Sequence, residues 1–239
     1  MKSAELFLLF RSQSLHAGVM QKIFRSIFCL VLAFACFNVK AQAKHDTSQW
    51  EKEIRAFEAS DRTNPPPQNG ILFIGSSSFR KWTNLVHAFP GKPIINRGFG
   101  GSQIPDSTAL ADRILFPYHP RLVVMYAGDN DLAAGRSAEQ VIADYREFVE
   151  KVHARLPDTV IAYLSIKPCP LRWNLRDKIV AVNTAIKGMS NDKLKFIDVY
   201  TPMLGDNGQP KPDLFLSDRL HPSDKCYTLW TGIIRPYLD

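Results

Sequence analysis

From Gly70 onward the chain alternates short apolar runs with longer amphipathic ones, and this alternation limits the possible fold more than any other feature. Strands that are covered on both faces read as nearly continuous apolar runs, whereas helices that cover a sheet repeat apolar residues every three or four positions. The alternation therefore indicates crossover units and a parallel sheet. The predicted strands are residues 71–74, 93–96, 122–127, 160–166 and 194–199.

The clearest predicted helix covers residues 137–156. Its apolar residues fall on one stripe and its charged residues on the opposite face, as expected of a helix that covers a sheet. Ser137 and Gln140 have the spacing of a capping box at the start of this helix. The stripe consists of Val141, Ile142, Tyr145, Phe148, Val149, Val152 and Leu156.

The segment before the first strand predicts a lead-in helix and a stiff connector. Trp50, Ile54 and Phe57 have helical spacing within residues 46–60, and the proline-rich residues 64–70 exclude both a helix and a central strand. Between Gly70 and the end of the chain no linker, repeat or low-complexity segment marks a second domain. We therefore predict a single three-layer α/β/α domain over residues 44–239, with a central, mostly parallel, five-stranded sheet.

Residues 1–43 have the pattern of a leader with a signal peptide. A basic start at residues 20–25 is followed by an apolar run at 27–37 and by the small-residue site Ala41-Gln42-Ala43. We predict translation from Met20, cleavage after Ala43 and export to the periplasm or the medium. The apolar run is about half the length of a membrane-spanning helix, so we predict no stable membrane insertion after cleavage. Lipid anchoring through Cys36 is not predicted, because the residues before it lack the large aliphatic side chain that usually begins such a site.

Loss of the leader changes the charge and the cysteine content. It lowers the formal net charge from +7 to +3, and without a Lys/Arg-rich run this gives no reason to expect a nucleic-acid partner. Cys169 and Cys226 remain, and their spacing leaves open whether they form a disulfide. No second pair of zinc ligands accompanies them. The charged residues of the leader are Lys2, Glu5, Arg11, Lys22, Arg25 and Lys40.

Polar and glycine-rich motifs directly follow three predicted strands. Because the carboxyl ends of parallel strands meet at one edge of a sheet, these motifs are expected to lie together. A fourth motif, near the end of the chain, places a carboxylate three positions before an imidazole. The four motifs are residues 75–78, 96–102, 128–131 and 217–222.

Taken in order, these four blocks resemble those of the SGNH hydrolases, also called the GDSL esterase/lipase family, over essentially the whole predicted domain. The resemblance implies a flavodoxin-like fold and places the nucleophile on Ser77, with Ser76 at the position of the family's aspartate. It also implies Asp218 and His221 as the other triad residues. The family's oxyanion hole falls on the backbone amides of Ser77 and Gly101 and on the side-chain amide of Asn130.

The chemistry of these residue types agrees with the resemblance. A serine hydroxyl is a weak nucleophile at neutral pH and needs a positioned base, for which histidine has a suitable pKa. His221 would take the proton of Ser77, while Asp218 would hold the ring and stabilise the imidazolium. We therefore expect a serine esterase for short acyl groups, such as acetyl, on a carbohydrate, glycolipid or small lipid. Neither a cofactor nor a metal is predicted, and the oligomeric state is left open.

Other readings of the chain stay open. An acyl-enzyme could pass its acyl group to a sugar hydroxyl instead of water, which would make the protein an acyltransferase. The fold could also serve as a catalytically silent carbohydrate-binding module. A metallohydrolase built on His119, Asp129 and Asp131 is not favoured, because no compact ligand motif is present. The residues considered for the pocket, outside the catalytic set, are Trp82, Arg97, Tyr126 and Lys167.

Overall fold

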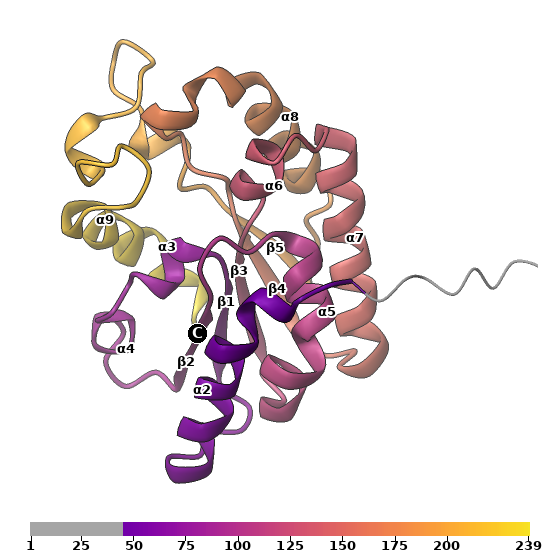
Figure 1. Cartoon of the computed structure of the whole chain (residues 1–239). Coiled ribbons are helices and arrows are strands. Elements are labelled where there is room, and N and C mark those ends of the chain that lie inside the picture. The colour runs from indigo at the N-terminus through magenta and orange to yellow at the C-terminus, as the bar shows by residue number, and fades with distance from the viewer. Residues whose placement is uncertain (1–44) are drawn as a thin grey trace, which may run out of the picture. The chain divides into compact units, whose positions relative to one another are not determined.

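Five parallel strands in the order β2-β1-β3-β4-β5 form the centre of the fold (Figure 1). The structure is a computed structural model that describes residues 45–239, so the predicted leader and its cleavage site lie outside the described residues. The strands are β1 (Ile71–Gly75), β2 (Ile94–Gly98), β3 (Leu122–Tyr126), β4 (Val160–Leu164) and β5 (Leu194–Ile197). The predicted fold class and all five strands are thus confirmed.

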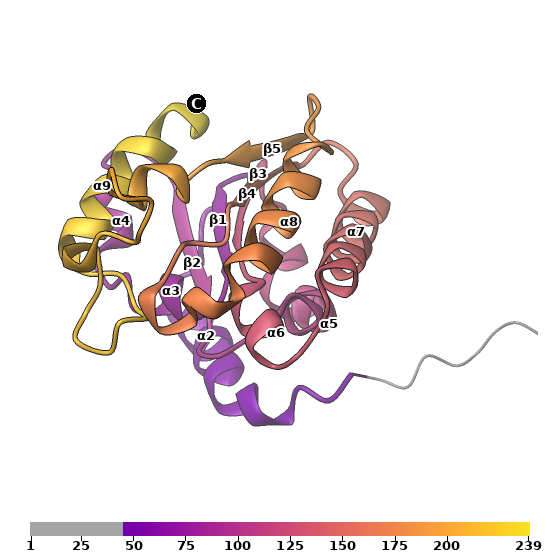
Figure 2. The same ribbon diagram turned by 90° about the horizontal axis from the view of Figure 1, so that it is seen from above.

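Helices cover both faces of this sheet (Figure 2). The α-helices are α2 (Glu51–Thr63), α3 (Ser77–Arg80), α4 (Leu85–Ala88), α5 (Ile104–Ile114), α6 (Asp129–Ala133), α7 (Ala138–Arg155), α8 (Arg176–Lys187) and α9 (Asp224–Ile234). The short 3-10 segments are η2 (Ser48–Trp50), η3 (Phe116–Tyr118), η4 (Pro170–Leu175), η5 (Thr201–Met203), η6 (Pro212–Leu214) and η7 (Arg235–Tyr237). None of the helices within residues 45–239 is long and apolar enough to cross a membrane.

Alternate residues of each strand face two separate apolar cores. In β1, Leu72 and Ile74 pack with the helices α2, α5, α7 and α8, whereas Ile71 and Phe73 pack with α3, α4 and α9. Burial on both sides explains why β1 and β3 are apolar throughout. The two cores thus cover both faces of the sheet that supports the loops at its edge.

The long helix α7 begins and ends where the sequence predicts. Ser137 caps it, because its side-chain oxygen accepts a hydrogen bond from the Gln140 amide (3.2 Å) while the Gln140 side chain accepts one from the Ser137 amide (2.8 Å). The lead-in helix lies a few residues later than its pattern suggested, at Glu51–Thr63, after the 3-10 turn of η2. The proline-rich connector has neither helix nor strand, as predicted.

Two strands end earlier than predicted, because side chains replace the strand ladder there. The Asn183 side chain accepts from the Ile166 amide (2.8 Å) and donates to the Ile166 carbonyl (3.0 Å), which takes Ile166, the last residue of the predicted strand, out of β4. The hydroxyl of Ser165 accepts from the amides of Val199 and Tyr200, each at 2.9 Å, and so ends β5 at Ile197. An apolar run alone does not predict such side-chain partners.

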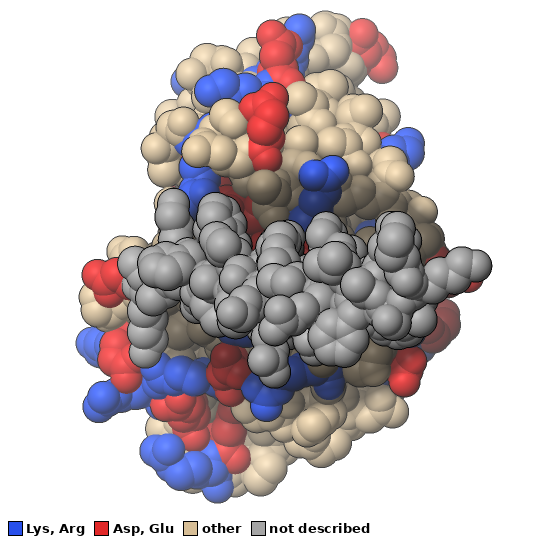
Figure 3. All heavy atoms as spheres, turned by 90° about the vertical axis from the view of Figure 1, so that its right-hand side faces the viewer, with Lys and Arg blue, Asp and Glu red and all other residues tan. Residues whose placement is uncertain are grey.

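Basic and acidic side chains are interspersed on the face seen in Figure 3.

Cys169 and Cys226 are both buried and both free thiols, so the disulfide that the sequence left open is not formed.

Candidate active site

Ser77 stands at the end of β1 because Gly75 allows the chain to turn sharply there. Gly75 has φ +133°, and a Cβ at this position would lie 2.0 Å from the carbonyl oxygen of Tyr126 on β3. Only glycine fits so close to the neighbouring strand. Ser76 continues the extended backbone and donates its amide to the same Tyr126 oxygen (2.9 Å), and Ser77 is the first residue of α3. The turn leaves Ser77 partly exposed at the carboxyl edge of the sheet.

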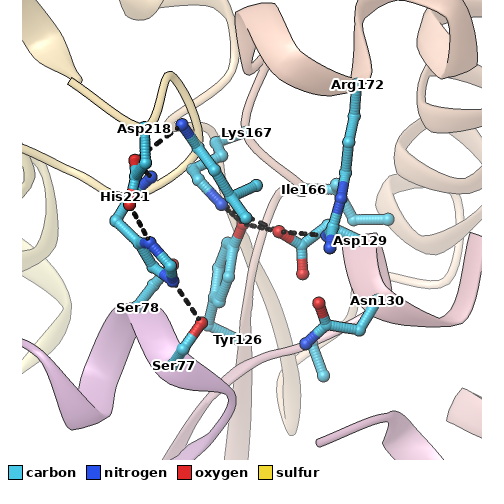
Figure 4. Close-up of polar contacts among 12 residues, drawn as sticks. Ser77, Ser78, Tyr126, Asp129, Asn130, Ile166, Lys167, Arg172, Asp218 and His221 are labelled. Atoms are coloured by element: carbon cyan, nitrogen blue, oxygen red, sulfur yellow. Dashed lines mark hydrogen bonds and ion pairs between the residues drawn. The ribbon is translucent and has the colours of Figure 1, made fainter. Parts of the chain in front are cut away.

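The loop between η6 and α9 brings an imidazole to this serine. Nε2 of His221 lies 3.0 Å from Oγ of Ser77, and Nδ1 of His221 lies 2.6 Å from Oδ2 of Asp218 (Figure 4). Since the Asp218 carboxylate accepts from Nδ1–H, Nε2 is left to accept from the serine hydroxyl. The structure therefore joins Ser77, His221 and Asp218 in one chain of hydrogen bonds.

The second carboxylate oxygen of Asp218 holds the loop itself in shape. Oδ1 accepts hydrogen bonds from the backbone amides of Leu220 (3.0 Å) and His221 (2.9 Å). Burial opposes ionisation of this carboxyl group, but the hydrogen bonds from His221 and Leu220 outweigh it and hold the pKa of Asp218 well below its usual range. The carboxylate thus stays charged beside the imidazole at neutral pH.

Gly101 lies in the loop that follows β2, and Asn130 lies in α6, the short helix that follows β3. Gly101 has φ +75°, a backbone conformation that favours glycine. A Cβ there would meet nothing within 4 Å, so a close contact is not the reason for glycine at this position. Asn130 lies in the first turn of α6, and its side-chain amide donates to the carbonyl oxygen of Ser102 (3.0 Å). This bond ties α6 to the loop of Gly101. That both residues donate to an oxyanion stays a prediction.

The two serines that flank Ser77 are buried. Ser76 and Ser78 are almost fully buried, and neither hydroxyl has a hydrogen-bond partner among residues 45–239. A buried hydroxyl away from the imidazole cannot act as the nucleophile in this arrangement. Of the three consecutive serines, Ser77 alone contacts His221 in the described part of the chain.

Two residues considered for the pocket are structural instead. Trp82 is 1% exposed and stacks on Tyr227 with ring centroids 4.8 Å apart. Arg97 pairs with Asp61, and its guanidinium lies over the ring of Tyr118 at 4.8 Å from the centroid. Both pack against helices, because aromatic and basic side chains near strand ends often fill the space between layers.

The other two pocket candidates, Tyr126 and Lys167, belong to a buried polar cluster that the sequence did not reveal. Lys167 donates to Oδ2 of Asp129 and to the Tyr126 hydroxyl, each at 2.8 Å, and Arg172 lies 3.3 Å from the same Asp129 oxygen. Burial opposes the charge on Asp129, but Lys167 and Arg172 hold its pKa below the usual range. The sequence signal that could have revealed this cluster is the position of two charged residues. Lys167 closely follows one apolar strand, and Asp129 closely follows the strand beside it.

The residues of the metal alternative do not come together. His119 precedes β3 and Asp129 follows it, so the two residues stand at opposite ends of that strand. Asp131 is buried, and its Oδ1 accepts from the Ile104 amide (2.9 Å). Within residues 45–239 no group of three or more His, Cys, Asp or Glu side chains is arranged to hold a metal ion.

Comparison with known proteins places this chain in a family. A family model described as the GDSL-like lipase/acylhydrolase family matches residues 68–229, which is more than half of the chain. No curated protein sequence matches the chain.

Solved structures share the fold at low identity. A Streptococcus pneumonia protein named as a candidate platelet activating factor aligns with TM-score 0.70 and 23% identity, covering 80% of this chain and 94% of its own. A GDSL-like lipase from Bacteroides thetaiotaomicron aligns with TM-score 0.65 and 19% identity, over 77% and 96%. A variant of an acetyl-xylooligosaccharide esterase from Geobacillus stearmophilus aligns with TM-score 0.57 and 16% identity, over 71% and 94%.

Proposed function

Since the chain belongs to the GDSL-like lipase/acylhydrolase family, we propose that it is a serine esterase that removes short acyl groups, such as acetyl, from a carbohydrate, glycolipid or small lipid. Family membership makes it a carboxylic ester hydrolase. The residues of the triad, the acyl group and the alcohol are the proposed parts. The observation that carries the proposal is the pair of contacts of 3.0 Å and 2.6 Å that His221 makes to Ser77 and Asp218.

In the proposed reaction, Oγ of Ser77 attacks the ester carbonyl carbon while Nε2 of His221 accepts the hydroxyl proton. Asp218 stabilises the imidazolium that forms. The tetrahedral intermediate collapses when the bond to the alcohol oxygen breaks, and His221 returns the proton to that oxygen. Water, deprotonated by the same Nε2, then attacks the acyl-enzyme and releases the acid, so that Ser77 regains its proton from His221.

The oxyanion of both tetrahedral intermediates needs donors that are already in place. We assign the amides of Ser77 and Gly101 and the side chain of Asn130 to this role. The hydrogen bond from Asn130 to Ser102 supports the assignment, because it fixes the side-chain amide beside the Gly101 loop. An amide that is fixed before the reaction costs no reorganisation during it.

A hollow beside the catalytic loop supports a sugar as the alcohol. It has a volume of about 390 Å³ and is lined by Trp173, Phe215 and three prolines, together with Gln209 and Arg219. Arg219, which lines the hollow, belongs to the same loop as Asp218 and His221, so the hollow lies beside the catalytic loop. Apolar and aromatic walls with a few polar groups are typical of small-molecule sites, and the C–H faces of a sugar ring pack well on an indole. We propose that the alcohol portion of the ester binds there.

Two features favour short acyl chains. The Geobacillus relative in fold is named for acetylated xylooligosaccharides. Residues 44–239 also contain no long apolar segment of the kind that forms the lid of a triacylglycerol lipase.

We further propose that the protein is exported, on the basis of the leader pattern in residues 1–43. Cell fractionation followed by mass spectrometry of the protein from each fraction tests this directly. A new N-terminus at Lys44 supports the proposal, and an intact leader on a cytoplasmic protein refutes it.

Hydrolysis of p-nitrophenyl acetate by the purified protein tests the proposed chemistry. We expect Ser77→Ala and His221→Ala each to lower kcat on the order of 10⁴-fold or more. Ser78→Ala is the matched control, because this neighbouring hydroxyl is buried away from His221 and its loss leaves kcat within about threefold. If Ser77→Ala cleaves the ester as fast as the wild type, the proposal is wrong.

A further inference from the structure

A buried ion pair includes Asp129, the residue next to Asn130 of the proposed oxyanion hole. Lys167 is 1% exposed, and its ammonium group contacts the Asp129 carboxylate and the Tyr126 hydroxyl. Removing two charges from water costs several kcal/mol per ion, and apolar residues in place of a buried pair are often no less stable. Stability alone therefore gives little reason for this pair.

A third charged group approaches the pair from η4. The guanidinium of Arg172 lies 3.3 Å from Oδ2 of Asp129, the same oxygen that accepts from Lys167, and its side chain is 17% exposed. One carboxylate thus faces two cations, and the cluster of Asp129, Lys167 and Arg172 carries a net charge of +1. Burial raises the pKa of the nearby Asp131 to about 7, so below that pH its carboxyl group does not cancel this excess.

The cluster is coupled to Asn130 through the backbone. Asp129 and Asn130 are the first two residues of α6, and Lys167, Arg172 and the Tyr126 hydroxyl all contact one oxygen of Asp129. In Figure 4, Arg172 extends from η4 toward Asp129, and Asn130 lies next to Asp129 on the side of Ser77. Fixing Asp129 therefore fixes the first turn of α6, from which the Asn130 amide projects.

We propose that Lys167 and Arg172 are positioning residues that clamp Asp129, aim the Asn130 amide at the oxyanion, and place one excess positive charge where negative charge develops in the transition state. The inference rests on the proposed function. In a site of low dielectric, a fixed charge of this kind acts more strongly on the transition state than on the neutral ester. The effect is therefore expected in kcat and not in KM.

Two substitutions separate this role from a purely structural one. Arg172→Gln removes the excess charge and leaves the buried pair in place, while Arg172→Lys keeps the charge. The double variant Asp129→Asn with Lys167→Met removes both charges of the buried pair together, so that neither of these two groups is left charged without the other, and the partly exposed Arg172 keeps its charge. Arg155→Gln, at the far end of α7, is the control for loss of a surface arginine.

The measurements are kcat and KM for p-nitrophenyl acetate, the melting temperature, and the affinity for a boronic acid, whose tetrahedral serine adduct resembles the intermediate. We expect Arg172→Gln to lower kcat about 10-fold with KM within about twofold, and boronic acid affinity to fall in parallel. Arg172→Lys should recover most of the loss. The double variant should lower kcat by about 10- to 100-fold while its melting temperature stays near that of the wild type.

Two results would overturn the inference. The first is a kcat within twofold of wild type in Arg172→Gln and in the double variant, in an enzyme that Ser77→Ala inactivates. The second is equal losses in Arg172→Lys and Arg172→Gln, because a charge effect requires rescue by lysine. If the wild type shows no hydrolysis that depends on Ser77, the proposed function itself is wrong and the inference falls with it.

Discussion

Nε2 of His221 lies 3.0 Å from Oγ of Ser77, although 144 positions separate the two residues in the chain. Ser77 is held by the end of β1, and His221 by a loop whose base is closed by the bridge between Phe215 and Pro222. Both supports belong to the same sheet edge and its flanking helices. The contact that the proposed proton transfer requires is therefore present without a bound substrate.

The Asn130 amide is the side-chain donor of the proposed oxyanion hole, so its removal should slow the chemical step. We expect Asn130→Ala to lower kcat on the order of 10²- to 10³-fold, with little change in KM. Steady-state kinetics with p-nitrophenyl acetate measure this. An Asn130→Ala variant with full activity and an unchanged fold would remove Asn130 from the oxyanion hole.

Gly75 is required by the close approach of β1 to β3. Gly75→Ala should lower the free energy of unfolding by roughly 2–4 kcal/mol, because the new Cβ overlaps the Tyr126 carbonyl and the backbone angle disfavours alanine. Gly232→Ala is the matched control: it lies inside α9 with open space around its Cβ, and a gain of roughly 0.5–1 kcal/mol is expected there. Urea unfolding gives both values. Equal effects at the two positions would contradict this account.

Asp131 makes stability depend on pH in an unusual direction. Burial raises its pKa in the folded protein to about 7, whereas in the unfolded chain it titrates near its usual value of about 4. Between about pH 4 and pH 7 the folded state therefore binds more protons than the unfolded state. The contribution of Asp131 to the free energy of unfolding falls as the pH rises through this range and levels off above about pH 7.

The substitution Asp131→Asn should remove this dependence, since the amide oxygen can still accept from the Ile104 amide. We expect the free energy of unfolding of the variant, relative to wild type, to rise by roughly 2–4 kcal/mol between pH 4 and pH 8. Chemical unfolding of both proteins across that range measures it. A difference that stays constant with pH would show that Asp131 is ionised in the folded protein throughout.

Trp173 should distinguish sugar esters from simple ones. If the alcohol portion packs on its indole, Trp173→Ala should raise KM for an acetylated xylooligosaccharide by about 10-fold and leave p-nitrophenyl acetate hydrolysis within about twofold. The ratio of the two kcat/KM values is the relevant quantity. A uniform effect on both substrates would place the sugar elsewhere.

Much of the fold could be predicted from the sequence because the necessary signals are local. The capping box of Ser137 and Gln140 lies within one turn, and the apolar strands carry their own pattern of burial. The ends of β4 and β5 could not be predicted, because Ser165 and Asn183 act on distant backbone groups. Propensity and periodicity contain no information on such partners.

Only part of the candidate site could be predicted from the sequence, for the same reason. Ser77, His221 and Asp218 lie in short motifs whose residue types suggest their chemistry, and the structure brings them into contact. Lys167 was considered only as a pocket residue, since its burial depends on Asp129, 38 positions earlier. A buried ion pair depends on two residues that are far apart in the sequence, and each of them taken alone would be predicted to lie on the surface.

The identity of the nucleophile is the central claim, and covalent labelling tests it most directly. The protein would be treated with a fluorophosphonate, digested, and the modified residue located by mass spectrometry. We predict one label, on Ser77, that is absent from Ser77→Ala and strongly reduced in His221→Ala. A label on Ser76 or Ser78, or an equal label in the His221→Ala variant, would contradict the account.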